Sequence, residues 1–166
     1  MHRLKKITKR AVPAALRRAE RYRLLNEPSD AESICLDILE VDKANKKAKV
    51  VLLLARTDQL DEDLTESYKA AREILDLFRD RYSKDYYEGI ICERRARTHH
   101  KRGFPGSSHV AYDWFCKAME CYRRAEKNRP ANEDEAILRW NSCARTLNKY
   151  PDLVRRPEEA VEHMLE

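Results

Sequence analysis

The densest group of side chains that could do chemistry is the basic run from Arg94 to Arg102, which includes the adjacent histidines His99 and His100. Guanidinium and ammonium groups bind carboxylates and phosphates, so the run is a candidate site for an acidic peptide or for nucleic acid. The alternative interpretation is a solvated last helical turn, where cations complement the negative end of the helix dipole. No motif with stacking aromatic residues at fixed spacing accompanies the run, which favours a protein ligand over RNA.

Other reactive residue types lack the companions that catalysis or metal binding needs. The acidic clusters at 61–63 and 133–135 come at expected helix starts, where acids are electrostatically favoured, and no nucleophile–base pattern accompanies them. His99, His100 and His109 have no carboxylate or cysteine at metal-ligand spacing. We therefore expect no enzymatic activity, no cofactor and no metal site.

The five cysteines, Cys35, Cys92, Cys116, Cys121 and Cys143, form no C-x-x-C motif. Each lies beside apolar neighbours in an expected helix, which predicts buried, reduced thiols and favours a cytoplasmic location. No apolar run approaches the roughly 20 residues that span a bilayer, so we expect no membrane insertion. The basic opening lacks the apolar core of a secretory signal, although it is also compatible with an organelle transit peptide.

The composition predicts a single all-α domain with a real core. The 166 residues are 42% hydrophobic and 38% charged and include three glycines, a balance that favours helix. Charge is spread unevenly: residues 1–26 carry nine bases and one acid, whereas residues 27–89 carry ten bases and sixteen acids. We divide the chain into a basic N-terminal arm or short helix at 1–12 and a helical domain at 13–166.

Apolar residues recur at helical spacing in seven segments of the domain. The expected helices cover about 14–26, 29–41, 45–59, 64–82, 85–101, 108–128 and 132–148, and a short terminal helix begins at Pro157. Proposed caps are Ser29 or Asp30, Asp85, and Asn132.

Two of these segments share a pattern of small and large residues. Ala118, Tyr122 and Ala125 lie at i, i+4 and i+7 on one helical face, and Pro130 ends the segment. Ala31, Cys35 and Ile38 repeat the same offsets earlier in the chain. Small residues allow a second helix to approach closely while the larger one fills the gap, so Tyr122→Ala is expected to destabilise the fold.

With this pattern the chain resembles the tetratricopeptide repeat (TPR) family over roughly residues 12–148. Ala19 and Tyr22 match the family's first helix, and Gly89 takes the small position in the third unit. The middle unit matches less closely, through Ala70, Ile74 and Leu77, and the loop 99–109 is expected to lengthen the third hairpin. The resemblance implies stacked antiparallel helical hairpins in a right-handed superhelix of about seven to eight helices.

The resemblance also implies a protein–protein interaction module that binds a peptide or partner helix in a concave groove. The positions that would line this groove are Leu16, Glu20, Arg23, Val50, Leu54, Tyr86, Ile90, Arg94, Arg97, Ile137, Asn141 and Arg145. Asn141 matches a position that peptide-clamping members use for a carboxylate, but Ile137 replaces their lysine, which argues against such a clamp. Two alternatives stay open: a nucleic-acid-associated protein using the basic N-terminus and residues 94–102, and a self-associating assembly unit.

Overall fold

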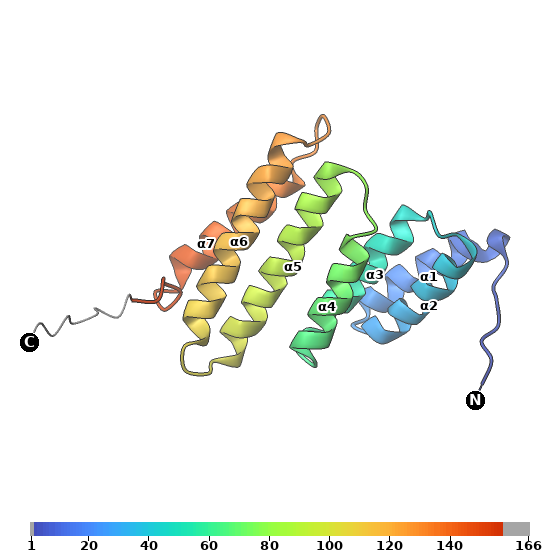
Figure 1. Cartoon of the computed structure of the whole chain (residues 1–166), viewed down its shortest axis with the longest axis horizontal. Coiled ribbons are helices and arrows are strands. Elements are labelled where there is room, and N and C mark those ends of the chain that lie inside the picture. Colours follow the sequence, from blue (N-terminus) through green and yellow to red (C-terminus); the bar gives the residue numbers. More distant parts are fainter. Residues whose placement is uncertain (1, 158–166) are drawn as a thin grey trace, which may run out of the picture.

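The chain folds into a row of packed helices. The computed structural model describes residues 2–157, so the terminal helix expected from Pro157 lies outside the described residues. Within them seven α-helices follow one another side by side, and no strand is present (Figure 1). They are α1 (Val12–Leu24), α2 (Pro28–Val41), α3 (Lys46–Asp58), α4 (Leu64–Leu75), α5 (Arg81–Arg102), α6 (Ser107–Lys127) and α7 (Glu135–Lys149), preceded by the 3-10 turn η1 (Lys9–Ala11). The all-α class predicted from the sequence is therefore confirmed.

Side chains cap α3, α4 and α5, and the observed helix boundaries correct several expected ones. Asp80 caps α5, since its carboxylate accepts the Ser83 amide at 2.8 Å. Helix α4 stops at Leu75, before this cap, and the expected cap Asp85 lies buried inside α5. Asn132 has a left-handed backbone (φ 63°) and does not cap α7, which begins at Glu135.

Two further expectations about local structure are wrong. Helix α2 begins at Pro28, ahead of the proposed caps Ser29 and Asp30, because proline suits the first helical turn. The third hairpin gains its length from its helices rather than from a loop. Helices α5 and α6 have 22 and 21 residues and are joined by only residues 103–106, where Gly103 and Gly106 adopt positive φ.

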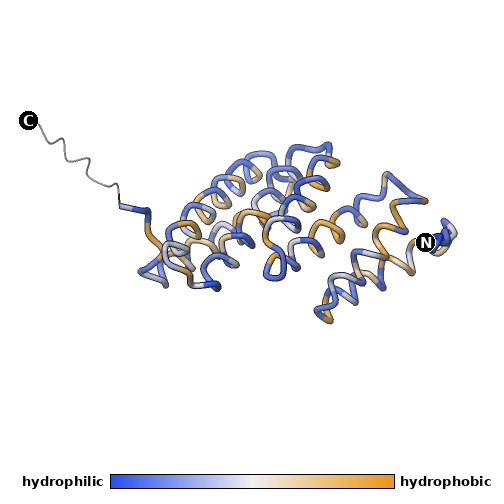
Figure 2. The backbone as a smooth tube through the Cα atoms, turned by 60° about the horizontal axis from the view of Figure 1, so that its bottom comes forward, coloured by the Kyte–Doolittle hydropathy of each residue, from blue (hydrophilic) through white to orange (hydrophobic). Residues whose placement is uncertain are grey.

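Hydrophobic and hydrophilic residues alternate along the helices (Figure 2), and the buried ones form three clusters along the row. The first lies where α1, α2 and α3 meet, and the second extends from α1 to α5. The third joins α5, α6 and α7, with Leu153 beyond α7. Leu54 and Tyr87 pack against both the second and third clusters. No helix of the described residues is long and apolar enough to cross a membrane.

Five of the six residues of the two sequence triplets lie in these clusters, and the sixth, Ala31, is buried outside them. Ala118, Tyr122 and Ala125 are all 0% exposed, as are Ala31, Cys35 and Ile38, which confirms their predicted packing role. The middle unit differs, since Leu77 lies beyond the end of α4 and is 48% exposed. Among the cysteines, Cys116 is exposed, which corrects the expectation of five buried thiols. Burial raises the pKa of Cys35 and of Cys143 to about 12, so both remain protonated thiols.

Tyr122 of α6 fits against Gly89 of α5. A Cβ on Gly89 would lie 2.5 Å from Tyr122 Cε1 and 2.7 Å from Cδ1, so only glycine leaves room for the ring. The Tyr122 hydroxyl donates to Glu93 Oε2 at 2.7 Å, and Glu93 is itself only 1% exposed. Burial and the neighbouring Glu93 carboxylate raise the pKa of Tyr122, which keeps the phenol protonated as the donor.

Tyr122→Ala is expected to lower the free energy of unfolding by about 3–5 kcal/mol, because it removes a fully buried ring and one donor to Glu93. Urea denaturation followed by circular dichroism at 222 nm measures the change. Tyr150→Ala, at a 37% exposed ring, is the control and is expected to cost less than about 1 kcal/mol. A loss for Tyr122→Ala no larger than that of the control would contradict the packing described here.

Gly89→Ala is expected to destabilise the protein by about 1–3 kcal/mol, although the same change inside an unconstrained helix is stabilising. The new methyl group would overlap the Tyr122 ring. The same substitution made in a Tyr122→Ala background removes the overlap and is expected to be neutral or stabilising. If Gly89→Ala has the same effect in both backgrounds, the ring is not what requires glycine.

Candidate basic face on alternate helices

The residues predicted to line a groove come from the alternate helices α1, α3, α5 and α7. Helix α1 contacts α3, and α3 contacts α5. Most of these side chains are half-buried or exposed. The half-buried ones include Leu16, Arg23, Val50, Leu54, Tyr86, Ile137 and Asn141, and the exposed ones are Glu20, Arg97 and Arg145. Ile90 is 1% exposed in the third core cluster, so it packs between helices and cannot contact a partner.

A chain of ion pairs crosses three of these helices. Arg23 of α1 donates to Asp58 Oδ2 at 2.6 Å, and Arg94 of α5 donates to the other oxygen of the same carboxylate. Arg94 also donates to the Leu54 carbonyl oxygen at 3.0 Å. Burial lowers the pKa of Arg94, while Asp58 opposes this shift. Arg94 is thus used to join helices, which restricts its availability to a ligand.

A second group of charges surrounds the buried Glu93. Arg97 donates to Glu93 Oε1 from Nε at 3.0 Å and from Nη2 at 2.9 Å, and Arg139 of α7 lies 3.5 Å from the same oxygen. Arg97 Nη2 also donates to Ser142 Oγ at 3.3 Å. These contacts satisfy a buried carboxylate and join α5 to α7. Sequence reasoning placed Arg97 on this face but missed Glu93, a single acid directly before the basic run Arg94–Arg102.

Beside this group lies a cavity of about 530 Å³, which we call the α5–α7 cavity. Its lining is mostly basic or hydroxyl-bearing and contains no acid: Arg97, His100, Lys101, Phe115, Ser142, Arg145, Thr146, Lys149 and Tyr150. Lys101 pairs with Asp61, and His100 Nε2 lies 3.3 Å from Asp152 Oδ2. Arg145 and Lys149 form no ion pair within residues 2–157 and are exposed. Two exposed cations that are free of ion pairs therefore line this cavity, and Lys149 Nζ lies 5.3 Å from the Tyr150 ring centre.

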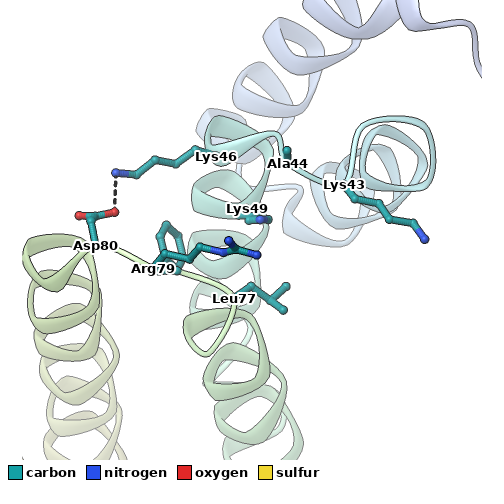
Figure 3. Close-up of a pocket in the computed structure, with 8 residues that line it drawn as sticks. Lys43, Ala44, Lys46, Lys49, Leu77, Arg79 and Asp80 are labelled. Atoms are coloured by element: carbon teal, nitrogen blue, oxygen red, sulfur yellow. Dashed lines mark hydrogen bonds and ion pairs between the residues drawn. The ribbon is translucent and has the colours of Figure 1, made fainter.

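A second basic cavity, which we call the turn cavity, also measures about 530 Å³ (Figure 3). It lies between the turn before α3 and the connection from α4 to α5, and is lined by Lys43, Ala44, Lys46, Lys49, Leu77, Phe78, Arg79 and Asp80. Figure 3 shows Lys46 reaching Asp80, at 2.9 Å. Sequence reasoning missed this cavity, because its bases come from two segments of an otherwise acidic third of the chain and share no local motif.

The three histidines do not converge on one point. His100 packs edge-on against the Tyr150 ring, and His109 Nδ1 lies 2.9 Å from the Val154 carbonyl oxygen. His99 Nε2 is buried without a hydrogen-bond partner among the described residues. Burial, together with Arg95 and Arg102, lowers the pKa of His99. No group of three potential metal ligands occurs within residues 2–157.

Comparison with known proteins adds no family assignment: no protein-family model, no curated protein and no solved structure matches the chain.

Proposed function

We propose that the chain is a TPR-like protein–protein interaction module that binds an acidic segment of a partner protein along α5 and α7. The observation that carries this proposal is the α5–α7 cavity, which has five basic residues and no acidic residue in its lining. Binding is non-covalent and needs no cofactor.

The cavity offers an acidic segment both charge and hydrogen bonds. The free cations Arg145 and Lys149 attract carboxylates, while Ser142 and Thr146 supply hydroxyl groups. Arg97 is held in place by Glu93, so its guanidinium is already oriented when a ligand arrives. The exposed Leu138 on α7, at 58%, provides an apolar contact on the same helix for a hydrophobic side chain of the partner.

Two observations favour a protein partner over nucleic acid. Of the two aromatic rings in the lining, Phe115 is fully buried, and Tyr150 already contacts His100 edge-on and has Lys149 Nζ 5.3 Å from its ring centre, so neither ring is free for a base to stack on. The basic N-terminal segment, with Arg3, Lys5, Lys6, Lys9 and Arg10, lies at the opposite end of the row from α6 and α7 (Figure 1). Lys6 there is paired with Glu40 at 3.0 Å. The two basic regions therefore do not form one continuous surface for a phosphate backbone.

The double charge reversal Arg145→Glu and Lys149→Glu is expected to weaken binding of a labelled acidic peptide at least tenfold. The reason is that two attractive charges at the cavity become repulsive. Fluorescence anisotropy of a fluorescein-labelled dodecapeptide rich in Asp, Glu and Leu measures the affinity at low salt, where surface charges are least screened. Wild-type affinity is expected to fall as salt is added.

The matched control is Arg123→Glu with Lys127→Glu. This pair has the same i, i+4 spacing and also ends at the last residue of a helix, α6, but lines neither basic cavity. It is expected to retain near wild-type affinity. Absence of peptide binding, or equal loss in both variants, would overturn the proposal. The nucleic-acid alternative would be favoured instead if single-stranded oligouridylate bound more tightly than the acidic peptide and this binding were lost in the Arg145/Lys149 variant.

A further inference from the structure

Arg95 differs from every other strong cation in the run Arg94–Arg102. Arg94 pairs with Asp58, Arg97 with Glu93 and Lys101 with Asp61, while Arg102 donates to the Asp61 carbonyl oxygen at 3.2 Å. Within residues 2–157, Arg95 has neither an ion pair nor a hydrogen bond to an acceptor. It projects to the other side of α5, towards α4 and α6 rather than towards α3 and α7.

Two aromatic rings hold the Arg95 guanidinium in place. Its Cζ lies 4.1 Å from the ring centre of Tyr68 on α4 and 4.3 Å from that of Trp114 on α6. The two ring centres are 5.7 Å apart with an interplanar angle of 68°, so the guanidinium lies in the angle between them. Lys117 adds a second positive charge, with Nζ 4.4 Å from the Trp114 ring centre. These cation–π contacts position the guanidinium without neutralising its charge.

The same part of α5 holds two buried polar atoms without partners. Arg95 Nε and His99 Nε2 are both inaccessible and make no hydrogen bond within the described residues. The two residues are four apart and therefore lie on one face of the helix. Buried polar groups almost always have a partner, so these two atoms leave unused hydrogen-bonding capacity on one helical face.

We propose that Arg95 and His99 form an oxyanion site on the α4–α6 side of α5, for a carboxylate or phosphoryl group. One oxyanion can accept from the guanidinium of Arg95 and from the imidazole of His99 when its Nε2 carries the proton. Lys117 adds to the positive potential there. This site faces away from the α5–α7 cavity and does not depend on the function proposed for that cavity.

Trp114 provides a direct signal for binding, since it touches Arg95. The chain has two tryptophans, and Trp140→Phe leaves Trp114 as the single fluorophore. In this background inorganic phosphate and acetate are titrated at constant pH and constant ionic strength, with chloride as the balancing anion. We expect a saturable change in Trp114 fluorescence with at least one of the two. Saturation with phosphate alone identifies a phosphoryl site, with acetate alone a carboxylate site, and with both a general oxyanion site.

Arg95→Gln is expected to weaken this binding about tenfold or more, as the loss of a charge-assisted hydrogen bond requires. Arg95→Lys keeps the charge but not the planar pair of donors, so a smaller loss is expected. Arg123→Gln, an exposed arginine of α6 that makes no ion pair among the described residues, is the control and should leave the affinity unchanged. As a second measurement, phosphate or acetate should raise the thermal midpoint of the wild type most, that of Arg95→Lys less and that of Arg95→Gln least.

The proposal is overturned if neither anion gives a saturable change, or if Arg95→Gln and Arg95→Lys both retain wild-type affinity. It is also overturned if Arg123→Gln weakens binding as much as Arg95→Gln does. The Arg145→Glu, Lys149→Glu variant separates the two proposals. It should lose the acidic peptide while retaining the Trp114 response to the small anion.

Discussion

The contact of Tyr122 with Gly89 fixes the distance between α5 and α6, the two longest helices of the fold. Because the glycine has no Cβ, the ring lies directly against the α5 backbone and its hydroxyl reaches Glu93. Glu93 in turn accepts from Arg97 and lies beside Arg139 of α7. One aromatic side chain thus connects the apolar packing of a hairpin to the charges that join it to the next helix. The position of the α5–α7 cavity depends on this arrangement.

Arginine and lysine side chains in this protein have three different kinds of surroundings, which their residue types alone do not distinguish. Arg94 and Arg23 share Asp58 and hold alternate helices together. Arg145 and Lys149 have no such partner within residues 2–157 and remain available to a ligand. Arg95 belongs to neither group, since aromatic rings hold it while its charge stays uncompensated among the described residues. The local partners of each cation therefore decide which surface can recognise an anion.

The sequence was sufficient for the helical class and for the residues that pack helices together. Small and large residues at i, i+4 and i+7 lie on one face of a helix, where they can pack against a neighbouring helix. Both triplets are fully buried. Boundaries were less predictable, because the apolar spacing of α4 continues to Tyr82 while the Asp80 cap starts a new helix at Arg81. The run Arg94–Arg102 was recognised as a candidate site, but Arg94 and Arg95 point to opposite sides of α5. Whether either arginine meets an acid depends on contacts with other helices, such as that of Arg94 with Asp58, 36 positions away. No local pattern encodes such a contact.

The division of the core into clusters has a consequence for partial unfolding of the protein. Within residues 2–157, the second and third clusters share only Leu54 and Tyr87 among their packed side chains, and the Arg94–Asp58 pair lies at the same junction. Contacts in a linear stack are made between neighbours, so each part can lose structure without exposing the whole. Amide hydrogens of α6 and α7 and those of α1 and α2 then exchange with solvent through separate opening events. A ligand held by α5 and α7 protects the first group while leaving the second nearly unchanged.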